Sequence, residues 1–205
     1  MPGGLSREIL DLTGEHLVLV AVALAIACAG AIPLGVFLSR RAAWRTWVLG
    51  FANVMQTVPS LALFGLLIPL PLLGGIGRRT AIVALVLYAL LPILRNTLTG
   101  LLGVDAAVVE SAVAMGMTPQ QRLFRVELPL ASRTILAGVR IAAVTTVGTA
   151  TIAAAIGGGG LGVFIFRGIA AVDTDLILAG AVPAALLALV VDGGLGWVER
   201  RFPQP

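Results

Sequence analysis

The sequence predicts an all-α integral membrane protein with five transmembrane helices, built as a single domain over residues 1–205. Hydrophobic residues make up 59% of the chain and charged residues 12%, with a mean hydropathy of +1.04. Soluble domains contain about 45–50% apolar and roughly 25% charged residues. This chain has too little charge to cover a water-exposed surface, which argues against a soluble enzyme, a disordered tail and a nucleic-acid-binding module.

Five apolar stretches are long enough to cross a hydrocarbon core of ~30 Å as helices. The second contains Pro59, Pro69 and Pro71, so we expect it to span in its first part and to bend afterwards. The segment Gly162–Val172 has 11 residues including Arg167, which is too short to span and favours an interfacial or re-entrant helix. The five predicted spans are Leu17–Leu38, Val48–Leu73, Thr80–Leu102, Thr134–Ile156 and Leu176–Val198.

The arginines predict the orientation of these spans. Arg40, Arg41 and Arg45 follow the first span closely, and basic residues next to a span are retained in the cytoplasm. Alternating the spans then places the amino terminus outside and the carboxyl terminus inside a bacterial cytoplasmic (inner) membrane. The inner arginines are residues 40, 41, 45, 122, 125, 133, 200 and 201, and the outer ones are residues 7, 78, 79 and 167.

Two series of small residues, each at a spacing of four, predict close packing between helices. Residues four apart lie on one face of a helix, and small side chains there let a neighbouring backbone approach. The two series are Ala23/Ala27/Ala31 and Gly180/Ala184/Ala188.

Several residue patterns that suggest chemistry are better explained by structure. All 14 basic residues are arginine, so the chain has no P-loop lysine, and any ATP and magnesium must bind to another subunit. His16 is the only histidine and cannot by itself build a metal site or a catalytic triad. Asp173 and Asp175 favour capping of the fifth span. Gly157–Gly162 satisfies GxGxxG but follows a predicted membrane helix, which favours a turn. We expect no cofactor and no catalytic residue in this chain.

The loop 103–133 carries six charges in 31 residues and is expected in the cytoplasm. Asp105 can cap the amino-terminal end of a first helix, Ala106–Met115, which would stop at Gly116. Thr118 can cap a second helix, and Gln121 completes a capping box with it. These signals predict two short helices at an angle on the inner membrane face.

The same loop resembles the EAA motif of ABC-importer permeases, which reads EAA, three residues, G, nine residues, I-x-L-P. Both spacings hold, with Ser111 in place of the second alanine and Val126 in place of the isoleucine. Pro129 is expected to end the second short helix before the fourth span begins. The matching positions are Glu110, Ser111, Ala112, Gly116, Val126, Leu128 and Pro129.

The resemblance implies a type I ABC-importer permease fold, similar to that of methionine importers, with the loop as a cytoplasmic coupling helix. It further implies two ATP-binding subunits, a second permease that is a copy or a paralogue, an extracytoplasmic substrate-binding protein and the lipid bilayer as partners. Gln56–Ser60, Leu91–Thr97 and Gly157–Ile169 resemble the glycine betaine/carnitine/choline branch, which imports osmoprotectants. A permease for methionine or another amino acid is the alternative. A stand-alone secondary transporter or channel would show more spans, repeats or mid-membrane acidic residues.

Polar residues on otherwise apolar spans are candidates for the translocation path: Asn53, Gln56, Thr57, Thr145, Thr146 and Thr149. Ordinary hydrogen bonding between helices explains them equally well. Three charges are expected within the membrane, and they serve either a structural role, such as pairing of Arg140 with Asp192, or gating: Arg95, Arg140 and Asp192. Quaternary ammonium groups are held by aromatic cages, and aromatic residues are sparse in the spans. We therefore expect high-affinity selection in the external binding protein and a weak, mainly polar path in the permease.

Overall fold

The computed structural model describes residues 2–71 and 74–202, and all regular elements within these residues are helical. Met1, Leu73 and Pro205, to which the predicted domain and span limits extend, lie outside the described residues. The elements are α1 (Pro2–Ser39), α2 (Ala42–Thr57), α3 (Ser60–Leu67), α4 (Arg78–Leu102), α5 (Ala106–Ala114), α6 (Pro119–Arg122), the π-helix η1 (Leu123–Glu127), α7 (Leu128–Ala150), the 3₁₀ helix η2 (Ile152–Ile156), α8 (Gly162–Ala171) and α9 (Thr174–Glu199).

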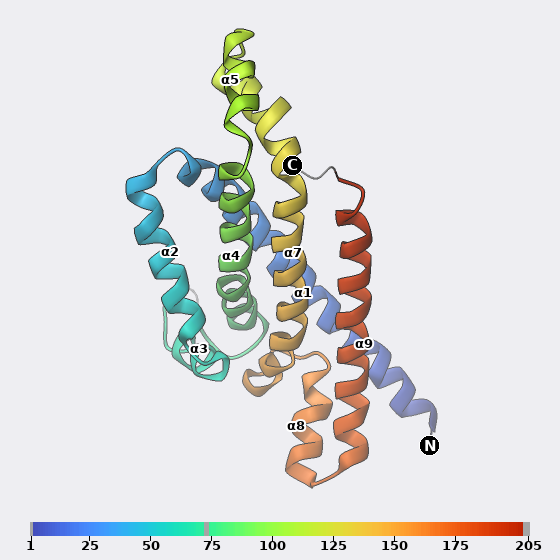
Figure 1. Ribbon diagram of the computed structural model, residues 1–205. Helices are drawn as coiled ribbons and strands as arrows, with labels where there is room; N and C mark the ends of the chain where they lie inside the picture. Colours follow the sequence, from blue (N-terminus) through green and yellow to red (C-terminus); the bar gives the residue numbers. More distant parts are fainter. Residues whose placement is uncertain (1, 72–73, 203–205) are drawn as a thin grey trace.

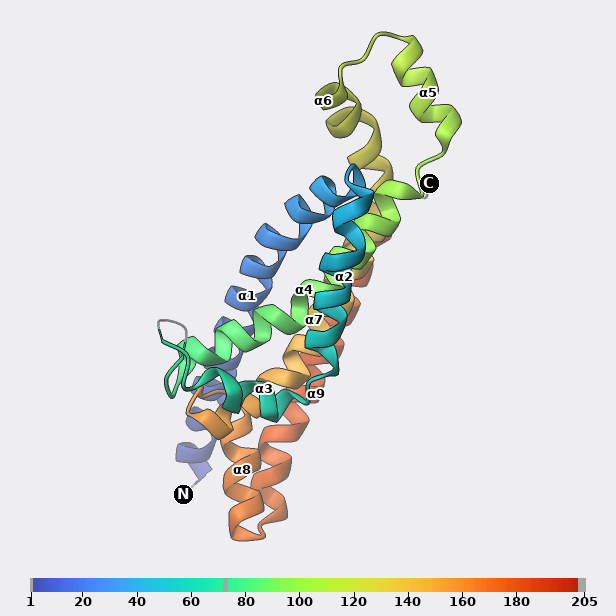
Figure 2. The ribbon, with the colours of Figure 1, turned by 90° about the vertical axis from the view of Figure 1, so that its left-hand side faces the viewer.

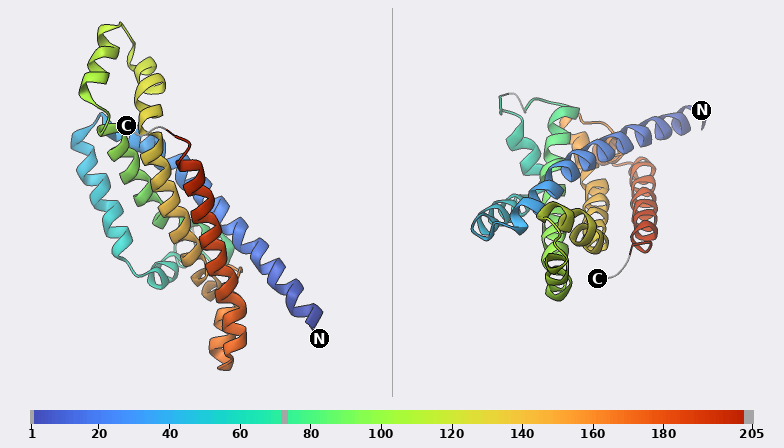
Figure 3. Two further views of the ribbon diagram at one scale, coloured as in Figure 1. Left: turned by 45° about the vertical axis from the view of Figure 1, so that its right-hand side comes forward. Right: turned by 90° about the horizontal axis from the view of Figure 1, so that it is seen from above.

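Helices α2, α4, α7 and α9 stand side by side, and the long α1 crosses behind them (Figure 1). The view from above shows α1 running along one side of this row (Figure 3). Helices α5 and α6 project from the end at which α9 finishes, whereas α3 and α8 lie toward the opposite end (Figure 2). The side of the row that faces away from α1 is therefore left uncovered by helices of this chain.

Among the residues that the structure describes, four helices are long and apolar enough to cross a membrane, and the count rises to five if α2 and α3 form one broken span. These two helices meet at an angle of 102°. Val58 has extended backbone angles there, because a proline disfavours the helical conformation of the residue before it. The bend that the prolines predict is thus located at Pro59. Helix α1 begins well before the predicted start at Leu17, with Pro2 at its first position, where a proline is tolerated.

Small residues let the central helices approach, as predicted. Ala23, Ala27 and Ala31 are fully buried where α1 crosses α4 and α7. At Gly180, an added Cβ would lie 2.6 Å from the carbonyl oxygen of Leu161, so α8 and α9 can pack only around a glycine. Both small-residue series therefore mark helix contacts.

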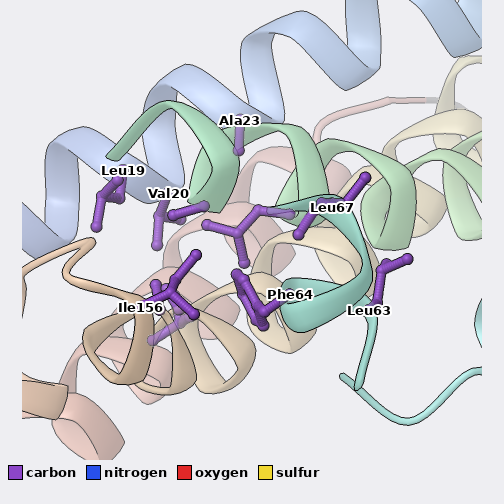
Figure 4. Packing of buried hydrophobic residues seen from close by; sticks show 13 residues of the cluster. Leu19, Val20, Ala23, Leu63, Phe64, Leu67 and Ile156 are labelled. Carbon is purple, nitrogen blue, oxygen red and sulfur yellow. The ribbon is translucent and has the colours of Figure 1, made fainter. Parts of the chain in front are cut away.

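Helix α3, the second part of the broken span, covers the end of the bundle opposite to α5 and α6. Figure 4 shows Phe64 and Leu67 of α3 packed against Leu19 and Val20 of α1 and Ile156 of η2. Phe64 is completely removed from solvent. This apolar contact explains why the chain folds back after Pro59 instead of continuing along the axis of α2.

Pro129 does not end the second short helix, so this part of the prediction was wrong. The chain is helical without a break from Pro119 to Ala150. A proline inside a helix lacks an N–H donor and clashes with the preceding turn. The wider π-turn at η1, in which Leu128 N–H bonds to Leu123 O, comes immediately before Pro129 and makes room for its ring.

Candidate functional site

The uncovered side of the helix row carries several polar residues of the spans. We call it the open face, and it includes the exposed residues Asn53, Arg95, Ile141 and Thr145 and the half-exposed Asp192. A cleft of about 370 Å³ lies on this face between α7 and α9. The open face thus combines four different helices, and it is the main candidate site within the membrane-spanning part.

The candidate path residues of α2 hold this helix against α4. Asn53 Oδ1 accepts a hydrogen bond of 2.8 Å from Arg95 Nη2. Gln56 Nε2 donates to Tyr88 O at 3.1 Å, and the Tyr88 hydroxyl donates to Val58 O. Thr57 bonds to its own helix, at Val54 O. Asn53 and Gln56 therefore make the interhelical hydrogen bonds of the alternative explanation while remaining exposed on the open face.

The three candidate threonines of α7 differ in direction. Thr145 is exposed and Thr149 half-buried, and both hydroxyls donate to carbonyl oxygens of their own helix. Thr146 is only 1% exposed and points into the bundle. A path at the surface of this chain would include Thr145 and Thr149 but not Thr146.

Opposite charges pair between α7 and α9. Arg140 donates to both carboxylate oxygens of Asp192, from Nε at 2.6 Å and from Nη2 at 2.8 Å. Its Nη1 lies 3.3 Å from Glu199 Oε2, and Arg133 Nε lies 4.0 Å from Glu199 Oε1. Pairing of Arg140 with Asp192, one of the two alternatives for these charges, is present in the structure.

Glu199 is absent from the predicted site, although the sequence contains a signal for it. Arg133 and Arg140 are seven residues apart, and so are Asp192 and Glu199. Seven residues are about two helical turns, so each pair lies on one face of its helix. Because α7 and α9 are antiparallel and the two spacings are equal, Arg133 can pair with Glu199 while Arg140 pairs with Asp192.

The loop 103–133, which contains α5 and α6 and is called the projecting loop below, has the caps that the sequence predicts. Asp105 Oδ1 accepts from Ala107 N–H at 2.8 Å. Gly116 has a φ of +77°, in the left-handed region that a helix-ending glycine adopts. Thr118 and Gln121 form the reciprocal capping box. Local signals alone therefore account for the two short helices and the turn between them.

The motif residues of this loop fall into an exposed and a buried set. Glu110, Ser111 and Gly116 are exposed, whereas Ala112 is buried. Val126 and Leu128 are half-buried at the π-turn, where Leu128 packs beside α1, and Pro129 is exposed. The first half of the motif thus presents a surface, and the second half anchors the loop to the bundle.

Glu127 is a second residue that the sequence reasoning missed. Its Oε2 lies 3.1 Å from Arg40 Nη2 at the α1–α2 connection, and its Oε1 lies 2.7 Å from Arg122 Nε. With Glu110, these side chains line a pocket of about 370 Å³ at the base of the loop. Glu127 occupies the variable position of the motif, and its contact with Arg40 has no local signal, because Arg40 is 87 residues away.

At the opposite end, the glycine-rich turn holds α1. Gly157, Gly159 and Gly160 all have positive φ, so this segment is a turn as expected. Glu15 Oε2 accepts from Gly160 N–H at 3.2 Å, and its Oε1 pairs with Arg78. Asp173 Oδ1 accepts hydrogen bonds from the backbone N–H groups of Asp175 at 2.9 Å and Leu176 at 3.2 Å, which confirms that Asp173 caps α9. Within the described residues, no three His, Cys, Asp or Glu side chains gather as metal ligands.

The arginines outside the spans divide between the two ends of the molecule. The eight predicted inner arginines lie in the α1–α2 connection, the first turn of α2, the loop 103–133 and the residues that follow α9. These segments come together at one end (Figure 1). The beginnings of α1 and α4 and the helix α8 carry the other four and lie toward the opposite end. This separation is typical of a membrane protein with one positively flanked side.

Comparisons with known proteins agree with this architecture. Residues 31–204 match the family model described as "Binding-protein-dependent transport system inner membrane component". The chain is 46% identical over 189 residues to the carnitine transport permease protein OpuCD of Listeria monocytogenes, covering 92% of this chain and 83% of the relative. It is 44% identical over 194 residues to the glycine betaine/carnitine/choline transport system permease protein OpuCB of Bacillus subtilis, covering 95% and 88%. Its fold matches a chain of the inward-facing MetNI methionine ABC transporter with a TM-score of 0.89 over 100% of both chains, at 23% identity.

Proposed function

Because the chain belongs to the family of binding-protein-dependent transport system inner membrane components, we propose that it is the permease subunit of an ATP-driven importer for osmoprotectants such as glycine betaine, choline and carnitine. The relatives named above are permeases for carnitine or for all three compounds. They support this substrate class over methionine or another amino acid, because the likeness to the methionine transporter is one of fold at 23% identity.

The observation that carries the proposal is the projecting loop at the arginine-rich end. Helices α5 and α6 stand clear of the bundle (Figure 2), and their motif residues Glu110 and Gly116 are exposed. In the proposal this end faces the cytoplasm of a bacterium, and two ATPase subunits bind the loops of two permeases. ATP and magnesium are held by those subunits.

Coupling then depends on how the loop is attached. The unbroken helix from Pro119 to Ala150 joins α6 to α7, which lines the open face. Glu127 joins the same segment to Arg40 at the α1–α2 connection. Movement of the ATPases is passed to α7 through the first link and to α1 and α2 through the second. The open face lies against a second permease, a copy or a paralogue, and the path runs between them from an extracytoplasmic binding protein.

The test is uptake by vesicles that contain the permease, its ATPase subunits and the binding protein. We expect ATP-dependent uptake of glycine betaine, choline or carnitine and none of methionine. Uptake of methionine alone would support the alternative substrate. Glu110→Ala is expected to lower uptake and binding-protein-stimulated ATP hydrolysis together, because one contact serves both, while Gln120→Ala, exposed in the same loop, is the matched control. Wild-type uptake with Glu110→Ala contradicts the coupling role of the loop.

A further inference from the structure

The cleft between α7 and α9 has a composition that the helix contact alone does not explain. It opens on the open face. Its lining residues are Ala137, Arg140, Ile141, Val144 and Thr145 of α7 and Asp192 and Glu199 of α9. Charged side chains within a membrane-spanning helix are costly and rare, and they mark functional sites more often than structural ones. Here the charged pair remains accessible from the cleft.

Asp192 is the more accessible of the two carboxylates that line the cleft. Its side chain is 42% exposed, whereas that of Glu199 is 17% exposed. Each Asp192 oxygen accepts one hydrogen bond from Arg140 and keeps a lone pair for another partner. Gly196 lets the guanidinium lie directly against α9, because an added Cβ there would be 3.0 Å from Arg140 Cζ. The guanidinium is therefore packed toward α9, and the carboxylate borders the cleft.

This combination suits a quaternary ammonium group. Such a cation has no N–H to donate, so it is recognised by negative charge beside apolar surface and not by hydrogen bonds. The methyl groups of Ala137, Ile141 and Val144 supply the apolar surface, and Asp192 supplies the charge. None of the described residues that line the cleft is aromatic, so it lacks the cage that holds these cations tightly.

Arg140 has the geometry to keep this interaction weak. It already offsets most of the Asp192 charge, so an incoming cation meets a partly neutralised carboxylate. A transport path needs binding that is favourable enough for entry and weak enough for release. Arg140 also uses three of its five N–H donors on Asp192 and Glu199, which leaves two for the carboxylate of a zwitterion.

We propose that the α7–α9 cleft is a low-affinity subsite for the quaternary ammonium group of the transported molecule. Asp192 binds the cation, and Arg140 is the positioning residue that orients Asp192 and limits its affinity. The inference rests on the proposed function for its substrate class. Its test is a binding measurement on the assembled transporter that does not depend on transport.

The experiment follows alkylation of a cysteine in the cleft. Cys28 is the only cysteine in the sequence, so it is first replaced by serine. The transporter carries Cys28→Ser and Ala137→Cys, and the rate of reaction with a small thiol reagent is measured with increasing choline or glycine betaine. At a ligand concentration about four times the dissociation constant, the rate is expected to fall about fivefold, because the free fraction is 1/(1 + [L]/Kd). The neutral carbon analogue of choline, 3,3-dimethylbutan-1-ol, is expected to leave the rate unchanged.

Three variants separate binding from a structural ion pair. Asp192→Asn is expected to abolish protection by choline, whereas Glu199→Gln, which also removes a carboxylate bonded to Arg140, keeps it. Arg140→Gln is expected to shift half-maximal protection to lower choline concentration, which loss of a purely structural contact would not do. If Asp192→Asn does not assemble, Arg140→Gln combined with Asp192→Asn restores a neutral interhelical hydrogen bond and must also lack protection.

Equal protection by 3,3-dimethylbutan-1-ol, or protection that survives Asp192→Asn, overturns the proposal. Absence of any protection in a transporter that imports glycine betaine overturns the subsite and leaves the proposed function standing. Protection by choline in a transporter that imports neither choline nor glycine betaine would contradict the proposed function while supporting the subsite.

Discussion

Gly138→Ala tests how closely α4 and α7 must approach. Gly138 is buried in the contact between these helices. A Cβ at this position would lie 2.8 Å from Pro92 O and 3.0 Å from Asn96 Cγ, and closer still to Asn96 Cβ. Pro92 O and Asn96 Cβ are fixed by the backbone and cannot turn aside, so the two helices must separate, and the Asn96 amide must also turn away.

The expected cost follows from these two responses. Inserting a methyl group into a packed contact destabilises a protein by about 1–3 kcal/mol. Moving Asn96 also breaks its 2.9 Å bond from Nδ2 to Pro92 O, and a typical hydrogen bond contributes about 0.5–1.5 kcal/mol. We therefore expect Gly138→Ala to lower the free energy of unfolding by about 2–4 kcal/mol.

Gly148→Ala is the matched control on the same helix. Apart from the adjacent residues and the backbone of α7 itself, no described atom lies within 4 Å of a Cβ at Gly148. Alanine favours a helix by up to about 1 kcal/mol over glycine. Unfolding of the purified permease in mixed micelles of increasing denaturing detergent measures both variants. Equal stability of the two variants would show that α4 and α7 are not packed through Gly138 and would refute the reasoning.

Three further predictions concern the loop end. Gly116→Asn is expected to keep most uptake, because asparagine tolerates a left-handed backbone. Gly116→Val is expected to lower uptake, because the left-handed conformation costs valine about 1–2 kcal/mol. Equal loss of uptake in both variants would instead indicate that a partner contacts the glycine. Glu127→Gln is expected to lower uptake and stimulated ATP hydrolysis in proportion, since the link to Arg40 loses its charge, and unchanged hydrolysis would argue against that link. Thr118→Cys with Cys28→Ser is expected to react with an impermeant thiol reagent only after cells are opened. Labelling of intact cells would reverse the proposed orientation.

The loop shows how far local signals reach. Asp105, Gly116 and the Thr118–Gln121 capping box form the predicted caps, because each involves partners within a few residues. The prediction at Pro129 was wrong because it also used only local information. A proline usually stops a helix, and only the π-turn before it, which depends on how Leu128 packs beside α1, lets the helix continue.

The path residues mark the limit of pattern reasoning. Thr145 and Thr146 are adjacent and chemically identical, yet one is exposed and the other is buried. Adjacent helical residues point about 100° apart, so the distinction depends on the rotation of α7 about its axis. That rotation is set by contacts with α1, α4 and α9 together.

By itself, the sequence determined the membrane class, the approximate helices, their caps and the family, because hydropathy, capping and motif spacing are properties of short segments. The tertiary structure alone decided that Arg140 binds both Asp192 and Glu199, that Glu127 reaches Arg40, and that one side of the helix row stays open. These contacts join residues 52, 59 and 87 positions apart. They form only when packing of small residues has fixed the crossing and rotation of whole helices, which no short segment encodes.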